Sequence, residues 1–479
     1  LGTEKAAARM IEDNLELDPF DFVSGFEAIK AENDSEKKQK MLDDLNGLMR
    51  NFQENYLMTA RDFAQWGAYE DAVLVLKQCT KKYPMLYYYA AYYEEKMGED
   101  EAAKKSLEKA ESCAFDYCFP NKLDDIAVLT FAIENGCKKK APYYLGNLFY
   151  DKLQWKKSVE LWEMSKKADD TFSIVHRNLA LAYYNKMGDS KAAKRELEKA
   201  FSLNRKDARI FLELDQLYKK LGYSFKERLA KYDEDPSLAE SRDDLYIEYI
   251  TLMNMCGEYE RAYRCIMGRR FHPWEGGEGK ITTQYTISLL EMAKQYLASE
   301  KYEQAEKLLK KALVYPENLG EGKLEGTKDN HLFYHLGLAL EAQGKYDEAK
   351  TCFETATIGT DEPAGAMYYN DQPADMILYQ GLAFEKLGKT REAKSRFYRL
   401  IDYGEQHLND EGKIEYFAVS LPDFLIFDED YTKKNRAHCC YLMALGNIGL
   451  QNREKAAEFL NEALEIEPSH MMATLYQKQ

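Results

Sequence analysis

Apolar residues recur along most of this chain at the spacing of amphipathic helices, and these helices come in pairs. In the clearest pair, small residues that permit close approach of two helices stand at Gly337, Ala349 and Ala356, while large apolar residues that fill a seam stand at Leu340, Tyr346 and Phe353. Gly344 lies between the two helices and is expected to end the first one, because glycine tolerates a left-handed backbone. The pattern therefore predicts an all-α protein.

The paired pattern repeats with a period of about 34 residues, which is typical of helical solenoids. Further copies are centred on residues 60–84, 91–110, 145–162, 179–200, 214–229, 257–266, 293–312, 381–397 and 444–468. The copy at 179–200 carries one extra residue in its first helix. Its neighbour at 214–229 is degenerate.

Residue by residue, these copies resemble the tetratricopeptide repeat family. The resemblance implies a right-handed superhelix (solenoid) of about ten helix pairs, in which the first helices line the concave side. Some members of the family grip a peptide carboxylate with lysine and asparagine on successive first helices. The residues at the corresponding positions here are mixed, which counts against such a clamp: Arg61, Tyr92, Asn147, Leu181, Lys294, Leu338 and Leu382.

The whole chain, 1–479, is expected to be a single superhelix. Residues 1–50 are interpreted as incomplete N-terminal repeats, 51–268 as a first repeat block, 269–280 as a conspicuous loop, and 281–479 as a second block with inserted loops at 358–375 and 403–435. Ala7, Ile11 and Pro19 fit the second helix of a repeat whose first helix is missing. We therefore expect the natural protein to continue upstream of Leu1.

Four stretches interrupt the repeat, at 117–122, 269–280, 361–373 and 403–435. Each follows the second helix of one pair and precedes the first helix of the next. Such connections emerge on the same edge of a solenoid, so the four loops are expected to gather along one rim. Links between helices usually take about 2–8 residues, and these stretches contain more aromatic and charged residues than a turn requires.

The loop 269–280 holds most of the candidate binding residues: Arg269, Arg270, Phe271, His272, Trp274, Glu275 and Glu278. Aromatic faces with convergent polar groups suit a sugar-like ligand or a partner domain. Each residue also has a structural interpretation. Phe271 and Trp274 could plug the gap between two repeats, the two glutamates could cap the following helix, and the two arginines could bond helix carbonyls or those glutamates.

The later loops supply four more candidates, namely Tyr368, Tyr369, Asp371 and Tyr416. They are expected to lie near the loop 269–280 on the common rim. Packing of these aromatic residues against the flank of the superhelix is the alternative.

The net charge of −16 disfavours nucleic-acid binding. The sequence contains no apolar run long enough for a transmembrane helix, so no membrane partner is expected. Nine cysteines without a CxxC pair favour a reduced, cytoplasmic compartment. His331 and His335 stand four apart, as in many zinc sites, but no HExxH motif accompanies them. The expectation is that they are ordinary groove-facing histidines, with no metal, no cofactor and no catalytic residue.

Four segments extend the resemblance beyond the generic repeat: APYYLGNLFYDK (141–152), GRRFHPWEGGEGK (268–280), YYNDQPADMILYQGLA (368–383) and IEYFAVSLPDFLIF (414–427). They resemble the C-terminal repeat region of large bacterial proteins that carry an upstream β-sandwich domain of unknown function. This resemblance implies an association with carbohydrate processing only by analogy.

Three functions follow as hypotheses. The leading one is a non-catalytic interaction module that docks an upstream domain or a protein partner through the rim loops. A second is the accessory half of a carbohydrate-active enzyme, with Trp274 stacked on a sugar. The third is a peptide-binding adaptor that uses the concave groove.

Overall fold

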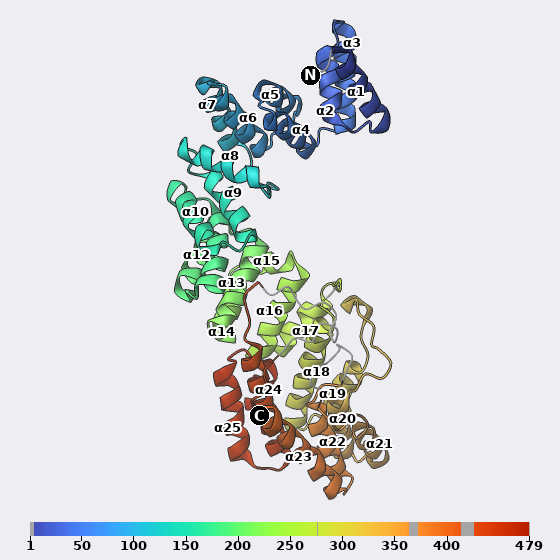
Figure 1. Cartoon of the computed structure of the whole chain (residues 1–479). Coiled ribbons are helices and arrows are strands. Elements are labelled where there is room, and N and C mark those ends of the chain that lie inside the picture. Colours follow the sequence, from blue (N-terminus) through green and yellow to red (C-terminus); the bar gives the residue numbers. More distant parts are fainter. Residues whose placement is uncertain (1–3, 275, 364–371, 413–425, 479) are drawn as a thin grey trace. The chain divides into compact units, whose positions relative to one another are not determined.

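The computed structural model describes residues 4–274, 276–363, 372–412 and 426–478, and its secondary structure there is helical throughout (Figure 1). The chain divides into two compact units, Leu1–Gly188 and Asp189–Gln479. The loop 269–280, expected to separate two repeat blocks, lies within the second unit.

The first unit consists of successive helices, each packed on its neighbours. They are α1 (Glu4–Leu17), α2 (Phe22–Ala31), α3 (Ser35–Met49), α4 (Gln53–Gln65), α5 (Tyr69–Gln78), α6 (Pro84–Lys96), α7 (Asp100–Ser112), α8 (Leu123–Glu134), α9 (Lys140–Asp151), α10 (Trp155–Ala168), α11 (Ser173–Ala182) and the π-helix η1 (Tyr183–Met187). The sequence did not predict α8, which packs between α6 and α9.

The second unit continues the paired arrangement. Its helices are α12 (Ser190–Leu203), α13 (Ala208–Lys220), α14 (Phe225–Asp233), α15 (Pro236–Glu240), α16 (Asp243–Cys256), α17 (Tyr259–Met267), α18 (Lys280–Ala298), α19 (Tyr302–Ala312), η2 (Glu317–Leu319), α20 (Asn330–Ala342), α21 (Tyr346–Ala356), α22 (Met376–Lys386), α23 (Thr390–His407), α24 (Tyr431–Gly449), α25 (Arg453–Ile466) and α26 (Met471–Gln477). α23 ends at His407 and α24 begins at Tyr431, so the expected loop bounds of 403–435 were too wide at both ends.

A glycine beneath an aromatic ring sets the distance between the helices of several pairs. A Cβ atom on Gly337 would lie 2.6 Å from the Phe353 ring, and one on Gly381 would lie 2.3 Å from the Phe397 ring. Gly146 has the same relation to Trp162 in the first unit, at 2.5 Å. In all three pairs the ring follows the glycine by 16 positions. The aromatic side chain can fill this seam only because the facing helix has no side chain there.

One seam residue was predicted wrongly. Leu340 and Phe353 are buried as expected, but 70% of Tyr346 is exposed. Tyr346 is the first residue of α21, where its side chain projects away from the seam. Gly344 has the expected left-handed backbone, with φ of +76°.

The extra residue expected in the repeat at 179–200 is accommodated by η1. The α-helix α11 passes directly into this π-helix, which ends at Gly188 with φ of +67°. A π-turn holds one residue more than an α-turn. The insertion is therefore absorbed within the helix, and Ala193 and Leu197 remain fully buried.

Truncating Phe353 should destabilise the second unit strongly. We expect Phe353→Ala to lower the free energy of unfolding by about 3–5 kcal/mol, because it empties a well-packed seam. Tyr346→Ala, on the same helix but exposed, should change it by less than about 0.5 kcal/mol. Denaturant unfolding of the two variants checks this, and equal effects would mean that the seam is assigned to the wrong residues.

Candidate functional site

Phe271 anchors the loop 269–280 to the second unit. Only 2% of Phe271 is exposed, and its ring stacks beside Tyr246 of α16, with 6.2 Å between ring centroids. Its backbone N–H donates to the carbonyl oxygen of Asn318, at 2.8 Å. Phe271 is therefore a structural plug, as its alternative interpretation stated.

Arg269 clamps the start of the same loop. Its guanidinium pairs with Asp243, the first residue of α16, and donates to the Glu240 carbonyl oxygen at 3.0 Å. The guanidinium carbon also lies 4.7 Å from the Tyr246 ring centroid, within the range of a cation–π contact. The carboxylate partner of Arg269 is thus Asp243 rather than Glu278, because the loop folds back toward α15 and α16.

His272 and Arg270 point toward solvent from this fixed loop. The backbone N–H of His272 donates to Asp243 Oδ2 at 2.8 Å, and its imidazole Nδ1 lies 3.3 Å from the same oxygen. The side chain of His272 is nevertheless 78% exposed. Arg270 is also exposed and forms no ion pair with any residue that the structure describes. These two side chains are the accessible groups of the predicted set.

Trp274 is half-buried on its own loop. A Cβ atom on Gly277 would lie 2.3 Å from the indole, so the ring rests directly on the Gly277 backbone. The Lys280 ammonium lies 5.7 Å from the ring centroid. At least one face of the indole is therefore covered by protein, which leaves less of it to stack on a sugar.

Two glutamates bind backbone N–H groups of the glycine-rich half of the loop. Glu278 accepts from Gly276 and Glu321 accepts from Gly279, each at 2.8 Å. Glu278 thus stabilises its own turn, while the carboxylate nearest the start of α18 comes from another loop. Burial, together with the nearby charge of Glu278, raises the pKa of Glu321.

The segment 313–329 between α19 and α20 is the partner of the loop 269–280, and sequence reasoning missed it. The Asn318 amide donates to the carbonyl oxygens of Ile266 and Arg269, at 2.8 and 3.0 Å. Leu319 is fully buried beneath the loop. One proline and three glycines in this segment, which are incompatible with a continuous helix, were the available signal: Pro316, Gly320, Gly322 and Gly326.

A cleft of about 630 Å³ lies at the base of the loop. It is lined by Glu240, Tyr246, Arg261, Arg264, Cys265, Gly268 and Arg269. Arg261 is engaged by Glu258 at 2.8 Å and also pairs with Asp233. Arg264 is exposed and, like Arg270, forms no ion pair with a described residue. The cleft therefore presents cationic groups on a chain whose overall charge is strongly negative.

The remaining predicted site residues, Glu275, Tyr368, Tyr369, Asp371 and Tyr416, lie outside the described residues. The arrangement of the four loops along one rim stays a prediction. The loop 117–122 belongs to the first unit and the other three to the second.

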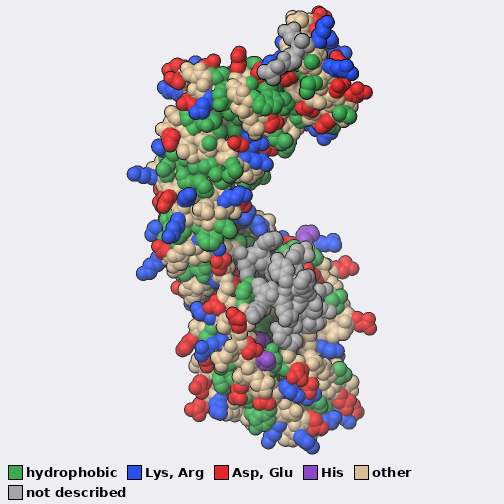
Figure 2. Space-filling model, in the orientation of Figure 1, with side chains coloured by type: hydrophobic (Ala, Val, Ile, Leu, Met, Phe, Trp, Pro, Cys, Tyr) green, Lys and Arg blue, Asp and Glu red, His purple; other side chains and the backbone are tan. Residues whose placement is uncertain are grey.

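The loop 117–122 presents apolar side chains from a fixed backbone. Tyr117 is 88% exposed and Phe119 is 67% exposed, while the intervening Cys118 is buried. The buried carboxylate of Asp125 accepts from the backbone N–H groups of residues 121 and 122, each at 2.8 Å, and from the Tyr89 hydroxyl at 2.7 Å. On the face of the molecule that Figure 2 shows, apolar side chains are visible over much of the first unit.

His331 and His335 do not form a metal site with other side chains. Among the described residues, no group of three or more histidine, cysteine, aspartate or glutamate side chains is placed to hold a metal ion. His335 Nδ1 lies 2.7 Å from the His331 carbonyl oxygen, and both rings pack near Tyr379. Burial lowers the pKa of each imidazole to about 3. The two residues are neutral packing groups at pH 7.

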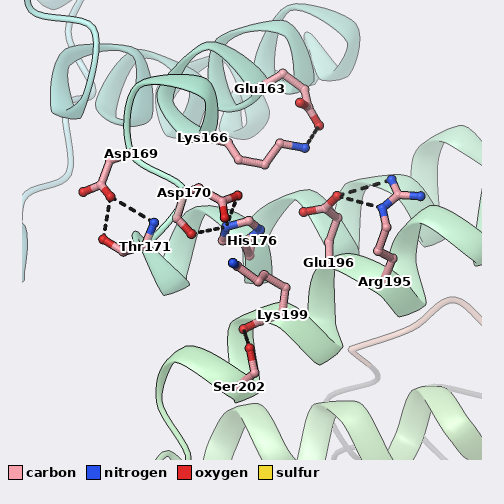
Figure 3. A network of polar contacts seen from close by, with 10 residues as sticks. All are labelled: Glu163, Lys166, Asp169, Asp170, Thr171, His176, Arg195, Glu196, Lys199 and Ser202. Atoms are coloured by element: carbon pink, nitrogen blue, oxygen red, sulfur yellow. Dashed lines mark hydrogen bonds and ion pairs between the residues drawn. The ribbon is translucent and has the colours of Figure 1, made fainter.

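A polar cluster in the first unit surrounds His176, which is only 1% exposed (Figure 3). Its Nε2 lies 3.0 Å from the carbonyl oxygen of Asp170. Asp169 accepts from the Thr171 backbone N–H at 2.9 Å, and the ammonium of Lys139 holds the pKa of Asp169 at about 2. These contacts fix the turn between α10 and α11, so they explain the local fold without requiring a ligand.

None of the described helices combines the length and the apolar character needed to cross a lipid bilayer.

Two tetratricopeptide repeat family models match the chain. One matches residues 178–207, 331–357 and 437–470, and the other matches 375–403. These segments coincide with four of the helix pairs described above.

Similar solved structures are also repeat proteins. A tetratricopeptide repeat protein from Parabacteroides merdae is 18% identical, with 60% of this chain and 98% of that chain covered and a TM-score of 0.26. The Cut9–Hcn1 hetero-tetramer of the APC/C is 12% identical, with 99% and 93% covered and a TM-score of 0.28. YrrB, a tetratricopeptide repeat protein with an unusual peptide-binding site, is 18% identical, with 54% and 100% covered and a TM-score of 0.20.

Adding a side chain at Gly320 should detach the loop 269–280. Gly320 has φ of +74°, and a Cβ atom there would lie 2.4 Å from the Phe271 carbonyl oxygen. We expect Gly320→Ala to lower stability by about 1–3 kcal/mol through this clash, beyond the ~1–2 kcal/mol cost of a left-handed alanine, and to speed proteolysis within 269–280. Gly326→Ala is the matched control, because Gly326 has φ of +89° and no atom near its Cβ position. Equal proteolysis of the two variants would contradict the proposed anchoring.

The buried histidines predict a loss of stability in mild acid. Their folded pKa of about 3 lies below the ordinary value of 6.5, so the unfolded chain binds more protons between these limits. Stability should therefore fall as pH decreases from about 6.5 toward 3, by up to about 1.4 kcal/mol per pH unit for each histidine. Burial raises the pKa of Asp375 to about 6, which opposes this trend for one group between about 3.8 and 6.

Denaturant midpoints measured from pH 7 to pH 4.5 check this expectation. His335→Gln should flatten the pH dependence, whereas His272→Gln, at an exposed side chain, should leave it unchanged. An identical slope in the wild type and both variants would show that His335 does not contribute.

Proposed function

Since this chain is a tetratricopeptide repeat protein, we propose that it is a protein-interaction scaffold that docks a partner domain through the loop 269–280 and the cleft beside it. The observation that carries the proposal is the exposure of Arg270 and His272 on a loop whose backbone is fixed at several points. The docking domain is a separate protein or an upstream part of the same polypeptide.

A fixed loop is well suited to recognition. Asp243, Asn318 and Glu321 hold successive parts of the backbone, and Phe271 buries its side chain beneath them. A surface that is ordered before binding loses less conformational entropy when a partner docks. The neighbouring contacts of Arg269 are satisfied within the chain, so Arg269 acts by positioning Arg270 rather than by binding the partner.

The charges of the site favour an acidic partner surface. Arg264 lines the cleft, and Arg270 stands on the loop above its base. The net charge of −16 would repel most acidic proteins at long range. Local cations of this kind select a partner by complementary contacts and make the interaction sensitive to salt.

The two alternatives are supported less well by this loop. A sugar site would need an accessible aromatic platform, whereas Trp274 packs on Gly277 and near Lys280. A glycan panel on the full chain tests that alternative directly. The concave surface is a separate question, because its occupant in the second unit is a helix of the chain itself.

A charge reversal at Arg270 tests the proposed docking. A photo-crosslinking residue at position 272 would first capture the partner and allow its identification. We then expect Arg270→Glu to weaken binding of the purified partner at least about tenfold, because an exposed interface cation becomes repulsive. Calorimetry at two salt concentrations measures both the affinity and its electrostatic part.

Arg453→Glu is the matched control, because Arg453 is an exposed arginine of α25 with the same change of charge. It should bind the partner like the wild type, and both variants should have unchanged melting temperatures. Equal binding by Arg270→Glu and Arg453→Glu would reject the loop as the docking surface.

A further inference from the structure

The helix α26 lies against helices that come much earlier in the second unit. Leu475 packs with Met255 of α16 and Ile287 of α18. The Gln284 amide lies 3.4 Å from the sulfur of Met471, although 187 positions separate the two residues. Figure 1 places the C-terminal end of the chain beside α24. The end of the second unit thus returns to helices near its beginning.

The tyrosine of α26 enters an aromatic cluster. The Tyr476 hydroxyl lies 2.7 Å from the Tyr379 hydroxyl, and its ring centroid is 5.9 Å from that of Tyr441. The Lys294 ammonium lies 6.0 Å from the Tyr476 ring centroid, and Tyr476 is only 7% exposed. These partners come from the first helices α18, α22 and α24. We call Met255, Ile287, Lys294, Tyr379 and Tyr441 the α26 seat.

Continuation of the repeat does not explain these contacts. α26 follows the repeat matched at 437–470, so it stands where the first helix of another pair would begin. In a simple solenoid such a helix contacts only its nearest neighbours. α26 instead reaches α16, where the Lys478 ammonium also donates to the Met255 carbonyl oxygen, 223 positions away.

The helix is poorly suited to form without its seat. It has seven residues, whereas isolated helices shorter than about 12–15 residues are marginal in water. Its fully covered side chains are those of Ala473, Leu475 and Tyr476. The seat itself belongs to longer helices, such as α18 with 19 residues, that pack independently on their own pairs. A competing helix can therefore take the place of α26 without unfolding the seat.

We propose that the α26 seat is a binding site for a helical segment of a partner protein that carries an aliphatic residue followed by tyrosine, and that α26 occupies this site in competition with the partner. The aliphatic side chain would contact Met255 and Ile287. The partner's tyrosine would bond the Tyr379 hydroxyl and place its ring near the Lys294 ammonium, a favourable cation–π arrangement. This is recognition of an amphipathic helix by a preformed surface, and it does not depend on the loop 269–280.

A full-length variant with a vacated seat tests the proposal. Leu475→Asp combined with Tyr476→Asp should release α26, and the probe is a fluorescent peptide of residues 467–478. By anisotropy, the variant should bind this peptide at least about tenfold more tightly than the wild type does, because no occupant competes. A peptide carrying the same two aspartates is the control. A helical variant that fails to bind the native peptide, or that binds both peptides equally, would overturn the proposal.

Recognition of the hydroxyl is tested in the same background. Tyr379→Phe should weaken the peptide about fivefold, the usual effect of losing one neutral hydrogen bond. Tyr334→Phe, at a ring 5.9 Å from Tyr379, is the control and should have no effect. Equal affinities for the two variants would remove Tyr379 from the recognition mechanism.

A second route avoids the double variant if it does not fold. The wild type is incubated with an excess of the peptide in which a benzophenone residue replaces Tyr476, and is then irradiated. Crosslinks should map to α18, α22 or α24. Crosslinks confined to other helices, or none at saturating peptide, would overturn the proposal.

Discussion

The contact on which the structure depends is the close approach of two helices at a residue without a side chain. Gly337 and Gly381 each lie under an aromatic ring of the following helix, and the rings are almost fully buried. Helices can meet this closely only where the facing position is small, so the small and large residues must keep a fixed separation along the chain. The π-helix η1 preserves the packing of its pair after an insertion, which shows how strictly the fold maintains this relation.

The constraint acts within helix pairs and leaves the links between pairs able to vary. The loop 269–280 uses this freedom, but it is not loose, because Asp243, Asn318 and Glu321 occupy its backbone groups. Two inserted links, 269–280 and 313–329, stabilise each other. The function proposed for the loop follows from this mutual anchoring, since it fixes Arg270 and His272 in place while leaving them in solvent.

The first helices of the second unit also bury polar groups that the repeat pattern does not require. Arg228 is 1% exposed and binds Asp215 through two hydrogen bonds, of 2.9 and 2.6 Å, and Glu248 through one of 2.5 Å. Such a network adds little net stability, because desolvation offsets the attraction, but it penalises other arrangements of α13, α14 and α16. A defined arrangement of first helices is also what the α26 seat needs, since its members come from helices far apart in sequence.

The sequence by itself determined the helix pairs, their period, the left-handed turn at Gly344 and the extra residue at 179–200, because these depend on contacts between residues close in the chain. It also identified 269–280 as an unusual loop. Only the tertiary structure decided that Phe271 is a plug, that Arg269 pairs with Asp243, and that 313–329 supports the loop. The seat of α26 was likewise invisible in the sequence. Its contacts join residues about two hundred positions apart, and no local pattern encodes which distant surfaces a solenoid brings together.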